Sequence, residues 1–170
     1  MPPLTLILGG ARSGKSAHAE ALLERLAPPW IYVATAEALD DEMRARIAAH
    51  RAQRGGGWRT VETPLDLPGA LQGAGRAPVL VDCLTLWLSN LMLGGHEQSA
   101  ACIALEAALD ARAAPTVLVS NEVGLGIVPE HALARAFRDE AGRLHQRMAA
   151  RADAVVLMVA GLPLVVKGNG

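Results

Sequence analysis

The chain opens on Leu4-Thr-Leu-Ile-Leu-Gly-Gly-Ala-Arg-Ser-Gly-Lys-Ser16, an apolar run that passes directly into a glycine-rich loop. From Gly9 the loop fits the spacing G-x-x-x-x-G-K-[ST], and residues Ala17 to Leu26 are typical of a helix. In this setting backbone N–H groups and the positive helix end surround phosphate oxygens, with Lys15 at the β- and γ-phosphates and Ser16 toward Mg²⁺. The stretch predicts a binding site for a nucleoside triphosphate.

Further apolar runs recur along the chain, and most are separated by helical or mixed segments. The apolar runs predict strands over Leu4 to Leu8, Trp30 to Ala34, Pro78 to Asp82, Thr116 to Ser120 and Ala154 to Ala160, and a further short strand is expected over Trp58 to Glu62. The expected helices are Asp40 to Gln53, Leu84 to Leu93, Glu97 to Arg112 and His131 to Arg151. Strands that are apolar throughout are buried on both faces, which predicts an α/β, P-loop NTPase-like fold with a mostly parallel sheet and helices on both faces.

Length and composition are typical of a single folded domain. At 170 residues, with 51% hydrophobic and 19% charged residues, we expect one folded domain over residues 1–170. A net charge of −1 excludes a broad electrostatic footprint for nucleic acid. Cys83 and Cys102 are interpreted as buried reduced thiols, and Ala154 to Val166 is too short and interrupted to span a membrane. These features favour a cytoplasmic protein with no membrane span and no nucleic-acid partner.

Asp82 closes the apolar run Val79-Leu-Val-Asp82. An acid at the carboxyl end of a buried parallel strand is where P-loop enzymes place the carboxylate that binds Mg²⁺. The alternative is an acid that caps the following helix, and both roles can coexist. Ser16 and Asp82 are therefore the predicted metal-binding pair.

A basic stripe runs along the expected helix before Gly55. Arg46, His50 and Arg54 follow one another at a spacing of four residues, with Arg51 alongside. Guanidinium groups around a neutral imidazole suit a polyphosphate, and a neutral ring nitrogen can attack phosphorus. On the pattern alone, a solvated basic helix face with an ordinary histidine is the stronger interpretation.

Polar residues also follow the expected strand at Thr116 to Ser120. Ser120, Asn121 and Glu122 come where open α/β sheets bind ligands, and the segment continues to Glu130 with two glycines. Substrate contact and simple capping of local backbone groups are both open interpretations.

Several segments together resemble one family, the bifunctional adenosylcobinamide kinase / adenosylcobinamide-phosphate guanylyltransferases of cobalamin biosynthesis. The resemblance spans nearly the whole chain, and Arg46-Ile-Ala-Ala-His-Arg51 and Asn121-Glu-Val-Gly-Leu-Gly-Ile-Val-Pro129 are its most selective parts. The other resembling segments are residues 9–16, 32–36, 41–51, 58–62 and 81–91, together with the continuation to Glu130.

The resemblance implies phosphorylation of adenosylcobinamide with ATP or GTP, then transfer of GMP from GTP to adenosylcobinamide phosphate. It implies a guanylylated histidine, which falls on His50, so His50 and Lys15 become the catalytic candidates. The nucleotide contacts that it implies are Gly9, Gly10, Ala11, Arg12, Ser13, Gly14, Lys15, Ser16, Ala34, Thr35, Ala36, Arg51, Ala52, Gln53, Arg54, Glu62 and Asp82. It also implies a homotrimer.

The chain departs from the family in its last long helix, where Gly142-Arg-Leu-His-Gln146 replaces the usual Gly-Arg-x-Asn-Gln. His145 thus stands in the place of an asparagine. Two alternatives accompany the bifunctional interpretation: a P-loop kinase for another small alcohol, and a nucleotide-binding switch without a small substrate. No motif distinguishes ATP from GTP in the kinase step or identifies corrinoid-binding residues.

Overall fold

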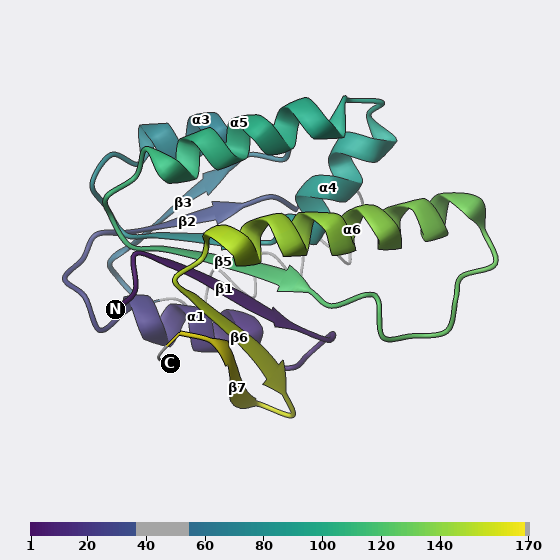
Figure 1. The fold of residues 1–170 in the computed structure, drawn as a ribbon. Helices are drawn as coiled ribbons and strands as arrows, with labels where there is room; N and C mark the ends of the chain where they lie inside the picture. Colours follow the sequence, from purple (N-terminus) through teal and green to yellow (C-terminus); the bar gives the residue numbers. More distant parts are fainter. Residues whose placement is uncertain (37–54, 169–170) are drawn as a thin grey trace.

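A computed structural model describes residues 1–36 and 55–168 of the chain. Its centre is a seven-stranded sheet of order β3-β2-β4-β5-β1-β6-β7, in which β7 alone is antiparallel (Figure 1). The strands are β1 (Leu4–Gly9), β2 (Trp30–Ala34), β3 (Trp58–Glu62), β4 (Val79–Asp82), β5 (Thr116–Asn121), β6 (Ala154–Val159) and β7 (Leu162–Lys167). The expected mostly parallel α/β sheet is confirmed.

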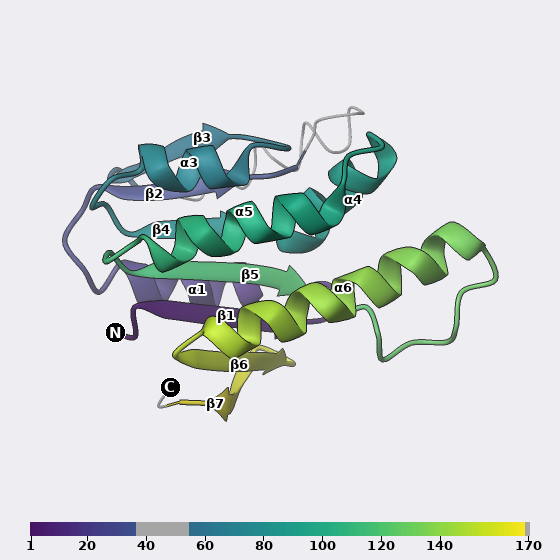
Figure 2. The ribbon, with the colours of Figure 1, turned by 45° about the horizontal axis from the view of Figure 1, so that its top comes forward.

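Helices cover both faces of the sheet. The described helices are α1 (Lys15–Leu23), α3 (Leu67–Gly73), α4 (Leu84–Leu93), α5 (Gln98–Asp110) and α6 (Ala132–Arg151). Figure 2 shows α3, α5 and α6 side by side in front of the sheet, with α1 behind it. Neighbouring strand residues point to opposite faces, so Leu6 joins the core under α3 to α6 while Ile7 joins the core under α1.

Because the first six strands are parallel, their carboxyl ends lie at one edge of the sheet, which we call the carboxyl edge. The loop before α1 follows β1 at this edge, and Asp82 ends β4 there. In the register, Gly9 lies opposite Asn121 of β5, and Asp82 lies opposite Val119 of the same strand. In the sheet, β5 therefore lies between the strand that leads into the glycine-rich loop and the strand that ends at Asp82.

The opposite edge, which we call the amino edge, is held by Arg112. Its guanidinium donates to the carbonyl oxygens of Leu71 (2.6 Å), Gly75 (3.2 Å) and Ala77 (2.8 Å), and its Nε donates to Thr116 Oγ1 (3.0 Å). One side chain thereby joins the end of α3, the turn into β4 and the start of β5.

Two elements were not expected from the sequence. The helix α3 is only seven residues long and contains Pro68, but the Asp66 carboxylate accepts from the Gly69 N–H at 2.9 Å, and Leu67 and Leu71 are buried. The strand β7 is exposed along its whole length, so it lacks the burial that makes an internal strand recognisable. A short helix gives a weak sequence pattern, and Gly161 and Pro163 interrupt the apolar run that contains β7.

A long connection leads from β5 to α6. Figure 2 shows it extending well beyond the sheet before α6 returns across it. Leu125, Ile127 and Val128 in this connection and Leu133 at the start of α6 are all exposed, as are four apolar residues of β7. Within the described part of the chain, no helix combines the length and apolar character needed to cross a bilayer.

Candidate active site

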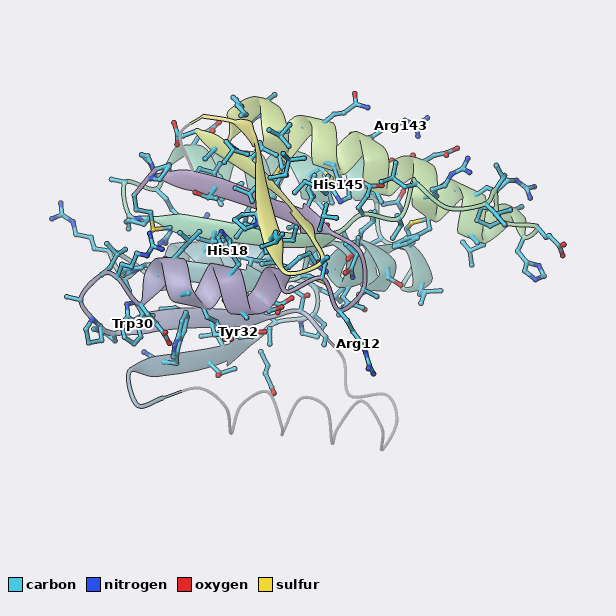
Figure 3. All side chains as sticks on the ribbon, turned by 90° about the horizontal axis from the view of Figure 1, so that it is seen from below. Arg12, His18, Trp30, Tyr32, Arg143 and His145 are labelled. Carbon is cyan, nitrogen blue, oxygen red and sulfur yellow. The ribbon has the colours of Figure 1, made fainter. Side chains whose placement is uncertain are left out.

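The glycine-rich loop places Lys15 at the first position of α1. Its side chain is buried, and Nζ donates to the Gly10 carbonyl at 2.7 Å, so the ammonium lies folded over the loop. Burial lowers the pKa of Lys15, and the nearby Asp82 carboxylate partly opposes this shift. The Arg12 side chain is exposed and extends outward from the loop (Figure 3).

Glycine is required at two positions of the loop for different reasons. A Cβ at Gly9 would lie 2.6 Å from Ser13 Oγ and 2.7 Å from the Met158 carbonyl oxygen, so no side chain fits there. Gly14 has φ of +93°, a left-handed conformation that a side chain would strain. The loop is also held from outside, because the Gly161 N–H donates to the Ser13 carbonyl at 3.1 Å and the Glu122 N–H to the Gly9 carbonyl at 2.9 Å.

Two features of this loop fit an anionic ligand. In the described structure no side chain caps the amino end of α1, and its first turn carries no acidic residue. Ser13 Oγ is buried without a hydrogen-bond partner among the described residues. A helix amino end with free N–H groups and a buried hydroxyl are suited to phosphate oxygens.

The Asp82 carboxylate joins two hydroxyl groups. Its Oδ2 accepts from Ser16 Oγ at 2.8 Å and from the Tyr32 hydroxyl at 2.7 Å. The helix α4 begins with Cys83 as its cap, which makes no side-chain cap bond, so capping is not the arrangement seen for Asp82. Sequence reasoning brought Ser16 and Asp82 together correctly but missed Tyr32, because a tyrosine in an apolar strand resembles an ordinary core residue.

The Ser16 and Asp82 pair fits a magnesium ion. A hydroxyl whose proton is committed to Asp82 keeps its lone pairs for a cation, and the carboxylate adds a second hard oxygen ligand. No group of three or more His, Cys, Asp or Glu residues within the described ranges is arranged to hold a metal. Mg²⁺ in nucleotide sites needs only one or two protein ligands, since phosphates and water supply the rest.

The ends of β2 and β3 carry the next group of expected contacts. Thr35 is fully buried: its Oγ1 donates to the Cys83 carbonyl at 2.7 Å and accepts from the Cys83 N–H at 2.9 Å. Asn90 donates to the Thr35 carbonyl at 2.8 Å and to the Pro64 carbonyl at 3.1 Å, which ties these two strand ends together. Ala34 lies opposite both Asp82 and Glu62 in the register, and half-buried Ala36 follows Thr35.

The end of β5 presents one fixed and one partly exposed polar side chain. Asn121 is fixed, because its Nδ2 donates to Thr85 Oγ1 at 3.1 Å. The Glu122 side chain is 22% exposed, and its Oε1 accepts from the Gly124 N–H at 2.6 Å. On the other side, buried Ser120 Oγ lies 2.7 Å from His145 Nε2 of α6 (Figure 3). The sequence pointed to Ser120, Asn121 and Glu122, but it did not indicate that Ser120 and Glu122 lie beside His145.

The remaining expected residues are outside the described part of the chain. These are the helix over Asp40 to Gln53 and the candidate residues Arg46, His50, Arg51, Ala52, Gln53 and Arg54. Their proposed roles rest on the sequence.

Comparison with known proteins gives a consistent result. Residues 5–166 match the family model described as cobinamide kinase / cobinamide phosphate guanyltransferase. A bifunctional adenosylcobalamin biosynthesis protein CobP from Pseudomonas aeruginosa is 51% identical, covering 96% of this chain and 97% of that protein. The CobU proteins of Salmonella typhimurium and Escherichia coli, with the same bifunctional description, are 46% and 42% identical, and each alignment covers 96% of this chain and 99% of the relative.

Solved structures with low sequence identity share the fold. An ATPase of a bacterial type III secretion system superposes with a TM-score of 0.60 at 10% identity, covering 96% of this chain and 56% of that one. The flagellar accessory protein FlaH from Methanocaldococcus jannaschii gives 0.54 at 14% identity, covering 99% and 80%. These similarities support the P-loop NTPase-like architecture and carry no information on substrate.

Proposed function

Because the chain belongs to the cobinamide kinase / cobinamide phosphate guanyltransferase family, we propose that it catalyses two successive reactions. It phosphorylates the primary hydroxyl on the aminopropanol arm of adenosylcobinamide with ATP or GTP, and then transfers GMP from GTP to that phosphate to give adenosyl-GDP-cobinamide. The observation that carries the proposal is the glycine-rich loop with Lys15 beside the Ser16 and Asp82 pair. We propose that this one domain carries both reactions.

In the kinase step, the loop from Gly9 to Ser16 binds the phosphates through its N–H groups and the amino end of α1. Lys15 moves its ammonium from the Gly10 carbonyl to the β- and γ-phosphates, where a compact cation offsets the charge of the transferring group. Ser16 and Asp82 would hold Mg²⁺, which when bound neutralises phosphate charge. The lowered pKa of Lys15 agrees with a cation that gains from an anionic partner.

In the guanylyl step, we propose His50 as the nucleophile. A neutral ring nitrogen of His50 attacks the α-phosphorus of GTP, a nitrogen–phosphorus bond forms, and pyrophosphate leaves. A phosphate oxygen of adenosylcobinamide phosphate then attacks the same phosphorus and displaces the histidine. This assignment rests on the family resemblance of the segment from Arg46 to Arg51.

We propose that the strand ends beside the loop complete the nucleotide site. Ala34, Thr35 and Ala36 follow β2, which pairs with the strand of Asp82, and Glu62 ends the next strand outward. The bonds from Thr35 to Cys83 support a fixed wall at this position. The family resemblance adds the other proposed contacts: Arg51, Ala52, Gln53 and Arg54.

The decisive experiment uses His50→Ala together with GTP labelled at the α-phosphate. The wild-type protein should acquire an acid-labile covalent label and make adenosyl-GDP-cobinamide. The variant should fold, acquire no label and make no such product, while it still phosphorylates adenosylcobinamide from ATP. His131→Ala serves as the matched control, since His131 is an exposed residue before α6 and its loss should leave labelling intact.

Three outcomes separate the alternatives. Continued labelling of His50→Ala would remove His50 from the mechanism and direct attention to His18, His96, His131 or His145. A wild-type protein that phosphorylates adenosylcobinamide without labelling would be a kinase alone. Nucleotide binding and slow hydrolysis with no phosphorylated product would indicate a switch.

We also propose that the chain forms a homotrimer in the cytoplasm. The exposed apolar residues of the connection before α6, and those of β7, are suited to contacts between subunits. The cysteines at positions 83 and 102 are both buried and unpaired, which suits a reducing compartment. Sedimentation equilibrium would test the assembly, and a monomeric mass at micromolar concentration would contradict it.

A further inference from the structure

The backbone of Glu122 lies beside the glycine-rich loop. The strand β5 pairs with β1 on one side and with β4 on the other, so it ends between the loop that follows Gly9 and the Asp82 carboxylate. Glu122 is the first residue after β5, and its N–H donates to the Gly9 carbonyl at 2.9 Å. A group at this point of the carboxyl edge lies next to the phosphates of a bound nucleotide.

The Glu122 carboxylate is held at one oxygen, and its side chain is partly exposed. Its Oε1 accepts the Gly124 N–H at 2.6 Å, while Oε2 lies 3.8 Å from His145 Nδ1, beyond hydrogen-bond length. The side chain keeps 22% of its surface exposed. The carboxylate is therefore positioned by its neighbours and still has an oxygen with which to accept a proton.

His145 of α6 lies beside this carboxylate, with Nδ1 3.8 Å from Glu122 Oε2. Burial lowers the pKa of His145, which favours a neutral ring with a single N–H. The Glu122 carboxylate beside Nδ1 favours the proton there, and in that tautomer Nε2 would accept from the Ser120 hydroxyl, 2.7 Å away. A ring fixed by buried Ser120 thus turns its N–H toward Glu122.

Other carboxylates at the carboxyl edge are less suited to accept a proton from substrate. Asp82 already accepts from two hydroxyl groups and is the candidate metal ligand. Glu62 ends β3, the outermost strand, with β2, β4 and β5 between it and β1. Within residues 1–36 and 55–168, Glu122 is the carboxylate that directly follows a strand paired with β1.

Resting on the kinase activity proposed above, we propose that Glu122 is the general base of the phosphorylation step and that His145 is its positioning residue. Glu122 Oε2 takes the proton from the primary hydroxyl of adenosylcobinamide. The hydroxyl oxygen forms a bond to the γ-phosphorus of the nucleotide, and the bond from that phosphorus to the β,γ-bridging oxygen breaks. The nucleoside diphosphate leaves, and the proton stays on Glu122 until it passes to solvent.

The test compares wild type with Glu122→Gln in two assays. Glutamine keeps the size of the side chain and an oxygen for the Gly124 N–H, but it cannot take up the proton. We expect kcat for phosphorylation of adenosylcobinamide by ATP to fall about 100-fold or more. The KM for ATP should stay within about threefold, because nucleotide binding is not altered. Covalent labelling by α-labelled GTP should be unchanged, because it uses a different nucleophile.

The outcomes are distinguishable. If wild type phosphorylates adenosylcobinamide and Glu122→Gln keeps its kcat within about threefold, this inference is overturned while the proposed function stands. If wild type makes no phosphorylated product, the proposed function itself fails. An equal loss of labelling and phosphorylation would assign Glu122 to the shape of the loop at Gly9 and would also overturn its role as base.

Substitution of His145 tests the positioning role. His145→Leu removes the N–H toward Glu122, and we expect kcat for phosphorylation to fall about tenfold with the KM for ATP unchanged. His145→Asn restores a side-chain donor, and we expect it to recover most of that kcat. If the folded His145→Leu protein keeps wild-type kcat and differs only in its melting temperature, His145 is a core residue and has no positioning role.

Discussion

The amino edge and the carboxyl edge of the sheet use their charged side chains differently. At the amino edge, Arg112 has four acceptors around its guanidinium, and its donors are committed within the protein. At the carboxyl edge, among residues 1–36 and 55–168, buried Lys15 has the Gly10 carbonyl as its one hydrogen-bond acceptor, and Ser13 Oγ has no partner. Both cations have a pKa lowered by burial.

This difference indicates that Arg112 at the amino edge contributes mainly to stability, whereas Lys15 at the carboxyl edge contributes mainly to ligand binding. A buried cation surrounded by acceptors stabilises the native state, whereas we expect a buried cation with a single carbonyl acceptor to exchange it for a bound anion. Substitutions at the two edges should therefore separate the free energy of unfolding from turnover. The three predictions below test this separation, from the largest effect to the smallest.

Lys15→Ala should reduce phosphorylation of adenosylcobinamide on the order of a hundred- to a thousandfold, because a cation at the transferring phosphate is lost. Its free energy of unfolding should change by less than about 1 kcal/mol, since burial already disfavours the charge. Steady-state kinetics and urea unfolding measure the two quantities. Lys167→Ala, at the other lysine of the chain, is the control and should keep turnover. Near-normal turnover of Lys15→Ala would refute the phosphate-loop assignment.

Arg112→Ala should give the reverse result. Loss of the guanidinium leaves three backbone carbonyls without their donor, so we expect a decrease of about 3 kcal/mol in the free energy of unfolding. The turnover of the folded fraction should not change. Arg143→Ala is the matched control, because Arg143 is 67% exposed and pairs only locally with Glu140. Equal stability of the two variants would show that the amino edge does not depend on Arg112.

The smallest effect concerns pH and His145. Burial lowers its pKa in the folded state below the value of about 6.5 in the unfolded chain, so the unfolded chain binds the proton more readily. The contribution of neutral His145 to the free energy of unfolding is therefore complete above about pH 6.5. It is lost as the pH falls toward the folded-state pKa, by at most about 1.4 kcal/mol per pH unit. Urea unfolding between pH 8 and 5.5 should show a smaller acid-dependent loss for His145→Asn. If the free energy of unfolding fell equally with pH in wild type and in His145→Asn, this expectation would be contradicted.

Much of the fold was predictable because most of its strands are largely buried. The strand ranges Trp30 to Ala34 and Trp58 to Glu62 and the helix Leu84 to Leu93 agree with the structure at both ends. The helix before Pro28 ends at Leu23 and not at Leu26, since Glu24 already closes it. Burial of whole strands gives long apolar runs. The seven-residue helix α3 gives only a short pattern, and the apolar run that contains β7 is interrupted by Gly161 and Pro163, so both elements were missed.

Of the candidate site, only the glycine-rich sequence motif and the acid at the end of β4 could be identified from the sequence. The spacing from Gly9 to Ser16 requires no knowledge of distant residues, and Asp82 is recognisable from its place at the end of a strand. The link from Tyr32 to Asp82 and the link from Ser120 to His145 join residues 50 and 25 positions apart in the chain. Such pairs depend on strand order and helix position, which periodicity does not encode.

The bond from Gly161 to Ser13 has a consequence for protein engineering. The exposed strand β7 and the turn before it could be chosen for removal in a shortened protein, because the parallel strands β1 to β6 pair with one another without β7. Yet the Gly161 N–H donates to the proposed phosphate-binding loop, and the Gly161 backbone lies where a side chain on Gly14 would touch it. We expect truncation before residue 160 to remove this contact and so to loosen the proposed phosphate-binding loop.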